Sequence, residues 1–566
     1  MRVRDCKFLA GGLGAVWGAV WAAVASAQAV GCSANVTEER LRACAEMGVQ
    51  IAAMVGEPAV VRAHWGVMVS GMDGTPIYAM NEGQFFQPAS NTKLFTTAAA
   101  MSLLGPETRF QTRVFAKGGI EADGRLNGEV VIVGGGEANL SGREVPYVSP
   151  ALRPKLAPAA RPLQEADPLR FLPEMADQVA ATGLKVVTGD VVGDDTVFPW
   201  EPYPSDWSID DMVWGYGAPV SALSVADDQL RLTVRPGSKA GQAATVVLEQ
   251  AVPYYTLQGT ATTLPAKSKE GGVQIERAPG AKVLRVYGGI AVDAGADVEE
   301  VAISDPAEYA AMAFKAMLEA RGVEVRGRAR AEHRATANFR GFLEQVREPI
   351  PFLEIAAEQW RTCPTPCGDG LPTTRPELLA THVSPTLRDD VTVTNKVSQN
   401  LHAELLLRQM GNALGQDGTE RGMDNASTAQ GARVVREFLI GAGVDPDDFV
   451  FFDGSGLSGH DLATPRATVR LLTWASGQAW FSAWKASLPV GGEDGSLATR
   501  FAKGSLKDHL FAKTGTLGEA RALSGYLDCA SGRTVAFSVM VTDHAPGGHA
   551  DQEVMDRMVT AIAAAN

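Results

Sequence analysis

A serine and a lysine lie three residues apart in the stretch PASNTKLFTTAAAMSLLG, residues 88–105. Residues i and i+3 share one face of a helix, so Lys93 can reach the hydroxyl of Ser90. The amide groups at a helix start and the apolar residues that follow favour a neutral lysine, which could accept the serine proton. The pattern indicates either a nucleophilic serine with its base or a serine that caps the helix beside an exposed lysine.

Two later stretches favour the nucleophile. Residues 398–400, Ser-Gln-Asn, precede a strongly apolar helical pattern, and residues 513–516, Lys-Thr-Gly-Thr, begin a predicted hairpin. The motifs S-x-x-K, S-x-N and K-T-G, in this order, are close to the set found in penicillin-binding proteins and serine β-lactamases. Each motif is weak by itself, whereas the ordered set in its expected local context is specific.

The chemistry of an acyl transfer gives the first two motifs their roles. Ser90 attacks a carbonyl and becomes an acyl-enzyme, with Lys93 as the base. Ser398 can relay the proton to the leaving amine, and Asn400 can hold both Lys93 and the substrate amide. We therefore expect these four side chains to meet in one active site.

The third motif suits recognition of the substrate. Lys513 and Thr514 offer a positive charge and a hydroxyl to a terminal carboxylate, and Gly515 allows the backbone to approach closely. The backbone N–H groups of Ser90 and Thr516 would form an oxyanion hole.

The distance between motifs separates the possible relatives. Residues 94–397 lie between the first two motifs, whereas a serine β-lactamase has only a short stretch there. The chain resembles the class C low-molecular-mass penicillin-binding proteins, a D-alanyl-D-alanine carboxypeptidase/endopeptidase family also called peptidase S13, which carries two extra domains at this place. Residues 189–225, 451–465 and 488–500 also look like segments of that family.

The resemblance implies an α/β fold in which a penicillin-binding transpeptidase-like domain, an antiparallel sheet flanked by helices, carries two inserted, largely β domains. The residue patterns agree, because strand patterns stand near both ends of the chain and helical patterns recur at 38–55, 305–322 and 550–565. We expect four parts: a signal peptide at 1–29, the catalytic domain at 30–106 and 350–566, inserted domain II at 107–222 and 300–349, and a small β domain III at 223–299.

The family cuts peptidoglycan stem peptides, either removing a terminal D-Ala or hydrolysing D-Ala–diaminopimelate cross-links, and penicillins acylate it. The resemblance therefore implies peptidoglycan peptides as substrates, β-lactam antibiotics as acylating inhibitors, and no cofactor or metal. A serine β-lactamase and a non-catalytic peptidoglycan-binding envelope protein are the alternatives.

An acidic and an aromatic residue five positions apart help the family to bind the free end of the diaminopimelate side chain. Asp211 and Tyr216 have this spacing, although Asp210 and Trp207 compete with them, and Asp211 could merely cap a turn. Many members have an arginine after DGSGLS that contacts the diaminopimelate carboxylate. This chain departs from that pattern, because Gly459 and His460 follow instead.

The first thirty residues have the layout of a secretory signal peptide. Basic residues precede an uncharged apolar run at 8–24, and the small residues that follow make Ala27 or Ala29 the expected last residue of the signal. An uncleaved anchor and lipidation at Cys32 are the alternatives. We expect export to the cell envelope, to the periplasm, with no transmembrane segment after the signal is removed.

Export affects the interpretation of the cysteines. In an oxidising compartment two local pairs could form disulfides, Cys32 with Cys44 and Cys363 with Cys367. A zinc site is the alternative, but no second Cys or His pair has a suitable spacing. Cys529 remains as a residue at the end of a strand.

Composition narrows the function classes further. The chain has 566 residues, too many for one compact core, so we expect several domains. The formal net charge of −14, with no stripe of basic residues, argues against a nucleic-acid partner. His544 and His549 could suggest a metallopeptidase, but they lack an HExxH helix, and a surface loop explains them better.

Overall fold

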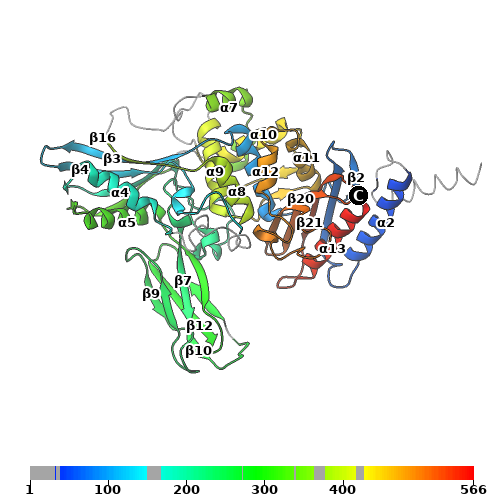
Figure 1. The fold of residues 1–566 in the computed structure, drawn as a ribbon, viewed down its shortest axis with the longest axis horizontal. Helices are drawn as coiled ribbons and strands as arrows, with labels where there is room; N and C mark the ends of the chain where they lie inside the picture. Colours follow the sequence, from blue (N-terminus) through cyan, green and yellow to red (C-terminus); the bar gives the residue numbers. More distant parts are fainter. Residues whose placement is uncertain are drawn as a thin grey trace, which may run out of the picture.

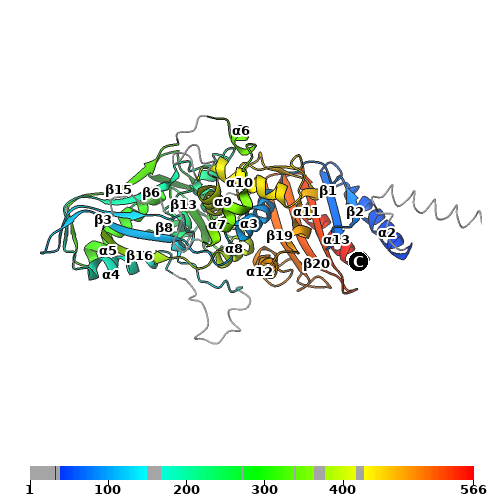
Figure 2. The same ribbon diagram turned by 90° about the horizontal axis from the view of Figure 1, so that it is seen from above.

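The structure is a computed structural model, which describes residues 32, 38–149, 167–270, 272–336, 340–362, 377–415 and 426–566. The molecule is elongated, with one sheet at each end and a helical region between them (Figure 1). Seen from above, β19 and β20 lie on one side of the central helices and β3 and β16 on the other (Figure 2).

The first sheet joins the two ends of the chain. Its five strands are all antiparallel, in the order β19 (Leu510–Leu517), β20 (Ala520–Asp528), β21 (Thr534–Thr542), β1 (His64–Gly71) and β2 (Pro76–Met80). The pair of β1 with β21 places Val67 opposite Val539. An N-terminal strand therefore completes a C-terminal hairpin.

Helices cover both faces of this sheet, which explains why its central strands are buried along nearly their whole length. One face packs with α2 (Glu38–Val55) and α13 (Ala550–Ala565), and the other contacts α11 (Pro465–Ala475). The helices predicted at 38–55 and 550–565 are confirmed with the same bounds, because both have a clear apolar face and no internal proline.

A helical region follows the sheet. The 3₁₀ turn η1 (Ala89–Asn91) leads directly into α3 (Thr92–Leu103), whose residues are almost all buried. This burial accounts for the uncharged, apolar sequence after Lys93. The surrounding helices are α6 (Phe342–Val346), α7 (Leu353–Thr362), α8 (Leu387–Lys396), α9 (Asn400–Leu414), α10 (Thr428–Gly441) and α12 (Phe481–Ser487).

A mixed sheet forms the opposite end of the molecule. Its strands are β3 (Gln111–Ile120), β4 (Arg125–Val133), β5 (Val186–Val187), β6 (Val191–Pro199), β14 (Glu324–Val325), β15 (Ala329–Arg334) and β16 (Glu377–Val383). The helix α4 (Phe171–Ala181) connects the parallel strands β4 and β5, and α5 (Pro306–Ala320) leads into β14, which is parallel to β5. Both helices bury their apolar faces in the same core. This inserted region therefore contains more helix than the predicted, largely β domain.

A small β module projects from the body of the molecule (Figure 1). It contains a three-stranded sheet, β7 (Gln229–Arg235), β8 (Thr245–Leu248) and β13 (Asp297–Ala302), and a second sheet, β9 (Thr256–Gly259), β10 (Thr262–Leu264), β11 (Val273–Glu276) and β12 (Val283–Ala291). The β runs predicted between 223 and 298 are thus confirmed as strands.

Short elements complete the fold: η2 (Asn139–Ser141), η5 (Asp211–Val213), η6 (Gly215–Gly217), η7 (Ala226–Asp228), η8 (Gly495–Leu497), β17 (Phe449–Val450) and β18 (Leu462–Ala463). The predicted α/β fold, an antiparallel sheet flanked by helices with additional β regions, is confirmed.

Some predictions fall outside the described residues, namely the signal peptide at 1–29 and the cysteines Cys363 and Cys367. Cys32 and Cys44 form a disulfide, and Cys529 is a buried free thiol directly after β20. Within the described part of the chain, no helix combines the length and the apolar character that crossing a bilayer requires.

Candidate active site

The three motifs meet between α3, α9 and the edge strand β19. Lys93 Nζ donates to Ser90 Oγ at 2.9 Å, to Asn400 Oδ1 at 2.6 Å and to the carbonyl oxygen of Ser455 at 2.7 Å. Ser90 lies in η1 and Asn400 at the first position of α9, so two elements far apart in sequence bring these groups together. The structure thus contradicts a plain helix cap beside an exposed lysine.

Lys93 is fully buried, and this burial alters its chemistry. Removal from water disfavours the ammonium form and lowers the pKa of Lys93 to about 7, although Asp453, Glu404 and Asp461 oppose the shift. A large part of the lysine population is therefore neutral at neutral pH. A neutral amine 2.9 Å from a hydroxyl can accept its proton.

The segment at 451–465 supplies a buried acidic cluster beneath Lys93. Asp453 accepts hydrogen bonds from the backbone N–H groups of Ser455, Gly456 and Ser458, which fixes the turn that presents the Ser455 carbonyl to Lys93. Glu404 on α9 accepts from the N–H of Gly454.

Two carboxyl groups of this cluster are biased toward their neutral form. Burial raises the pKa of Glu404 to about 8 and raises that of Asp461 well above its usual value. Asp461 accepts from the Thr92 hydroxyl at 3.0 Å and so connects the cluster to the start of α3. The three acidic residues oppose the lowering of the pKa of Lys93 without outweighing the effect of its burial.

A second buried lysine occupies the third motif. Lys513 Nζ donates to Ser398 Oγ at 2.8 Å and to the carbonyl of Thr514 at 2.9 Å. Burial, together with repulsion from Lys93, lowers the pKa of Lys513 well below its usual value. The hydroxyl of Ser398 therefore lies next to an amine that can exchange protons with it.

Gly515 allows β19 to approach the Ser90 turn closely. A Cβ atom at this position would lie 2.5 Å from the carbonyl oxygen of Pro88, far inside van der Waals contact. The Asn91 side chain donates to the carbonyl of Lys513 at 3.1 Å across the same junction. Thr514, whose hydroxyl is 2.6 Å from that of Ser496, and Thr516 follow on the same strand.

Asp211 and Tyr216 lie close together and near the second motif. The Tyr216 hydroxyl donates to Asp211 Oδ1 at 2.8 Å, and Asn400 Nδ2 donates to the Tyr216 carbonyl at 2.9 Å. The Tyr216 side chain is half-exposed, whereas Trp207 is buried and donates to Asp453. Trp207 is therefore not available to contact a substrate.

His460 takes a different partner. Its Nδ1 atom lies 3.3 Å from Asp206 Oδ2, and both side chains are exposed. Gln87 donates to the carbonyl of the preceding Gly459 at 2.9 Å. This position offers an imidazole paired with a carboxylate.

The described residues contain no group of three or more side chains suited to hold a metal ion. His544 and His549 lie in the loop before α13, as predicted, but the His544 side chain is buried and lies 3.5 Å from Asp551. Its contact is structural, so "surface loop" describes the backbone and not this side chain.

Comparison with known proteins identifies the family. A family model described as the D-Ala-D-Ala carboxypeptidase 3 (S13) family matches residues 47–338 and 368–565. The chain belongs to this family. The match includes all three motifs and most of the region between them, with residues 339–367 unmatched.

Individual relatives agree with this assignment. The chain is 31% identical over 530 residues to a D-alanyl-D-alanine carboxypeptidase of Actinomadura sp. (strain R39), covering 92% of this chain and 84% of the relative. It is 22% identical over 478 residues to the D-alanyl-D-alanine carboxypeptidase DacB of Haemophilus influenzae, covering 82% of each. The crystal structure of penicillin binding protein 4 from Haemophilus influenzae shares the fold, with a TM-score of 0.70 and 20% identity over 90% of this chain and 98% of that one.

Sequence reasoning found the residues of the three motifs but missed those that set their properties. Asp453, Glu404 and the carbonyl of Ser455 surround Lys93, yet the sequence of residues 451–465 indicated only a family resemblance and no contact with Lys93. A signal was present, because an acidic residue within the glycine- and serine-rich FFDGSGLSGHD indicates a turn stabilised by a carboxylate.

Proposed function

We propose that this chain is a penicillin-binding serine D-alanyl-D-alanine carboxypeptidase and endopeptidase that works through an acyl-enzyme on Ser90. The single observation that carries the proposal is the position of Lys93, fully buried and in hydrogen-bond contact with both Ser90 and Asn400. The family supports the peptidase over the β-lactamase and the non-catalytic alternatives.

In the acylation step, Ser90 Oγ attacks the carbonyl carbon of the D-Ala–D-Ala bond while Lys93 takes its proton. The backbone N–H groups of Ser90 and Thr516 stabilise the oxyanion of the tetrahedral intermediate. The C–N bond then breaks as Ser398, which accepts a hydrogen bond from Lys513, relays the proton that Lys93 took from Ser90 to the leaving amine, so that Lys93 is neutral again. Water later attacks the ester and releases the peptide with Ser90 restored.

Substrate recognition uses both ends of the peptide. Lys513 and Thr514 receive the terminal carboxylate, with Gly515 keeping the strand close to Ser90. Asp211 and Tyr216 bind the free end of a diaminopimelate side chain. They lie beside the second motif, because the Tyr216 hydroxyl donates to Asp211 and the Tyr216 carbonyl accepts a hydrogen bond from Asn400. A β-lactam acylates Ser90 in the same way, but its leaving group stays attached.

The cellular setting completes the proposal. Residues 1–29 direct export and are removed, and the mature protein works in the periplasm. The catalytic domain comprises 30–106 and 350–566, inserted domain II 107–222 and 300–349, and domain III 223–299. The sheets at the two ends of the molecule and the projecting module support this division.

The test compares wild type, Ser90→Ala and the matched control Ser531→Ala, which changes a serine in the turn between β20 and β21. Each protein is incubated with uncross-linked and cross-linked muropeptides, and released D-Ala and cleaved dimers are quantified. Wild type and Ser531→Ala should release both products, and Ser90→Ala should release neither. Turnover by Ser90→Ala would show that the nucleophile is misassigned, and release of D-Ala without dimer cleavage would remove the endopeptidase activity.

A further inference from the structure

The Ser398-Gln399-Asn400 loop has a backbone that needs external support. Ser398 has a φ of 59°, in the left-handed region that L residues other than glycine rarely adopt. Gln399 is the N-cap of α9, and its Oε1 atom accepts from the N–H of Leu401 at 3.0 Å. The other end of the same amide group, Nε2, donates to Asp227 Oδ2 at 3.0 Å. One side chain therefore connects this loop to a residue of the inserted region.

Asp227 is itself held firmly. Arg143 donates to its Oδ2 atom from Nε at 2.6 Å and also from Nη2, and His402 Nε2 lies 3.3 Å from Oδ1. Asp227 is buried, and all three residues of η7 (Ala226–Asp228) have positive φ values. Three consecutive non-glycine residues with a left-handed backbone conformation are unusual, so strong side-chain contacts must maintain the turn.

The positively charged side chains of Arg143 and His402 flank Asp227. Burial disfavours ionisation, but Arg143 and His402 outweigh it and hold the pKa of Asp227 well below its usual value. Burial likewise disfavours the imidazolium, but Asp390, whose Oδ1 lies 2.7 Å from His402 Nδ1, and Asp227 raise the pKa of His402 to about 9. Arg143 and His402 therefore both contact Asp227, and Asp390 contacts His402 from its other ring nitrogen, an arrangement that fixes these side chains in place.

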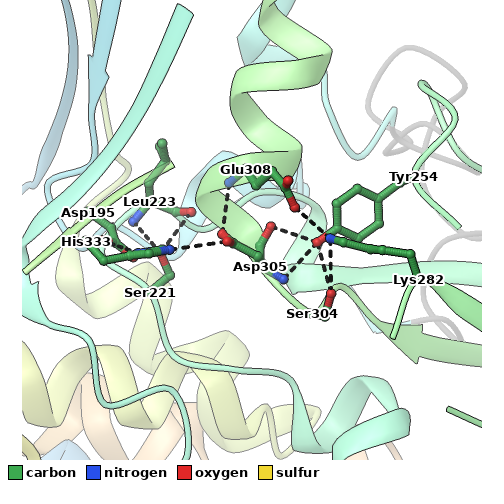
Figure 3. Close-up of polar contacts among 9 residues, drawn as sticks. All are labelled: Asp195, Ser221, Leu223, Tyr254, Lys282, Ser304, Asp305, Glu308 and His333. Carbon is green, nitrogen blue, oxygen red and sulfur yellow. Dashed lines mark hydrogen bonds and ion pairs between the residues drawn. The ribbon is translucent and has the colours of Figure 1, made fainter. Parts of the chain in front are cut away.

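The segment that carries Asp227 is anchored to the inserted sheet at its other end. The hydroxyl of Ser221 donates to Asp195 Oδ2 at 2.9 Å, and His333 Nδ1 lies 2.9 Å from Asp195 Oδ1 (Figure 3). His333 Nε2 lies 3.2 Å from Asp305, the N-cap of α5, so its ring joins β15 to β6 and α5. This network gives the turn at η7 a rigid base.

The same inserted segment contacts the loop a second time. Asn400 Nδ2 donates to the carbonyl of Tyr216 at 2.9 Å, while Asn400 Oδ1 receives from Lys93 at 2.6 Å. Residues 216–227 therefore hold the loop through both Gln399 and Asn400. Among the described residues, the Ser398 side chain makes one hydrogen bond, which it accepts from Lys513 at 2.8 Å.

We propose that Asp227 is a positioning residue for the acylation reaction: through Gln399 it sets the place of Ser398 and Asn400 relative to Ser90 and Lys93. The inserted region therefore takes part in the proton transfer geometry and not only in substrate recognition. This inference rests on the proposed acyl-enzyme on Ser90.

The test exchanges the charged and the neutral partner of the hydrogen bond between Asp227 and Gln399. Gln399→Glu keeps an acceptor for the Leu401 N–H, and a carboxylate favours the start of a helix, but it places two anions where Asp227 received a hydrogen bond. Asp227→Asn combined with Gln399→Glu restores a donor and an acceptor in reverse order. The carboxylate, now at position 399, becomes the acceptor for Arg143, whose Nε donates in wild type to the same Asp227 Oδ2 atom as Gln399. The four proteins are wild type, each single variant and the double variant.

The measured quantities are the acylation rate constant and the dissociation constant for a fluorescent penicillin, from stopped-flow or quench kinetics, and the melting temperature. We expect Gln399→Glu to lower the acylation rate constant about tenfold or more, and the double variant to recover to within about threefold of wild type. The matched control Glu276→Gln, in the exposed β11–β12 pair, should leave the rate constant at the wild-type value.

Four outcomes separate support for this inference from its failure and from failure of the proposed function. Loss in Gln399→Glu with recovery in the double variant supports the proposal, because a general loss of stability would not be repaired by a second substitution in the same cluster. A single variant that acylates at the wild-type rate overturns it. A double variant as slow as Gln399→Glu, with a wild-type melting temperature, also overturns it. If wild type itself is not labelled, the proposed function fails, which is distinguishable from failure of this inference.

Discussion

The region around Ser90 and the projecting β module differ in how far their charged side chains are buried. Lys93 and Lys513 are fully buried, and the ion pair of Lys396 with Asp494 is 5% and 13% exposed. In the module, Arg285 and Glu276 pair with side chains that are 57% and 51% exposed. Charge taken out of water has a large effect on pKa and stability, whereas charge left in water has little. This contrast indicates that the chemistry takes place around Ser90, where the charged side chains are shielded from water.

The largest effect should come from removing the buried base. Lys93→Met keeps the volume of the side chain but removes the amine that accepts the Ser90 proton. We expect the acylation rate constant for penicillin to fall about 10³-fold. Stopped-flow labelling measures it, and a fall of less than tenfold would assign the base to another group.

Breaking a buried pair should cost more stability than breaking an exposed one. Lys396→Met leaves Asp494 without its partner in a site that water hardly reaches, so the free energy of unfolding should fall by about 3 kcal/mol. Glu276→Gln in the module should change it by less than about 1 kcal/mol. Urea unfolding of both variants compares them directly, and equal losses would contradict the contrast between the two regions.

The pH dependence of acylation should show the depressed pKa of Lys93. Its folded value of about 7 lies below the usual value, so the neutral, proton-accepting form predominates above pH 7 and is lost as pH falls. Below that point the rate constant should decrease about tenfold per pH unit. A profile that stays flat down to pH 5 would show that Lys93 is not the base in its neutral form.

The smallest effect on acylation should come from Tyr216→Phe. This variant removes the hydroxyl that donates to Asp211 but keeps the backbone carbonyl that Asn400 contacts. We expect kcat/KM for cross-linked muropeptides to fall about fivefold, while penicillin acylation stays within about twofold of wild type. Equal losses for both substrates would show that Tyr216 supports the catalytic loop instead of recognising the peptide.

Local patterns in the sequence were sufficient for much of the fold. The apolar spacing at 38–55 and 550–565 predicted α2 and α13, and Asp305 marked the start of α5. These elements depend on neighbours within a few residues, which is the range that periodicity and capping signals cover. Strand patterns near both ends of the chain were visible, but they did not predict the pairing of β1 with β21, because strands that distant have no local signal.

The candidate site was predictable only in part, for a related reason. Ser90 and Lys93 share one turn, and a motif preserves that spacing, so the sequence showed them. The pKa of Lys93 instead depends on its burial and on Asp453, Glu404 and Asp461, which approach it from two other places in the chain, α9 and the segment 451–465. Asp227 is harder still, since its role becomes visible only once Gln399 and Arg143 are seen to meet on it.

Mapping of the penicillin adduct tests the central claim most directly. Wild-type protein is acylated with penicillin, digested with trypsin and analysed by tandem mass spectrometry. The fragment of residues 63–93 contains both Ser70, which is fully buried in β1, and Ser90. We predict the mass of one acyl group on Ser90. An adduct on any other residue, or a protein that stays unmodified, would contradict the proposed acyl-enzyme.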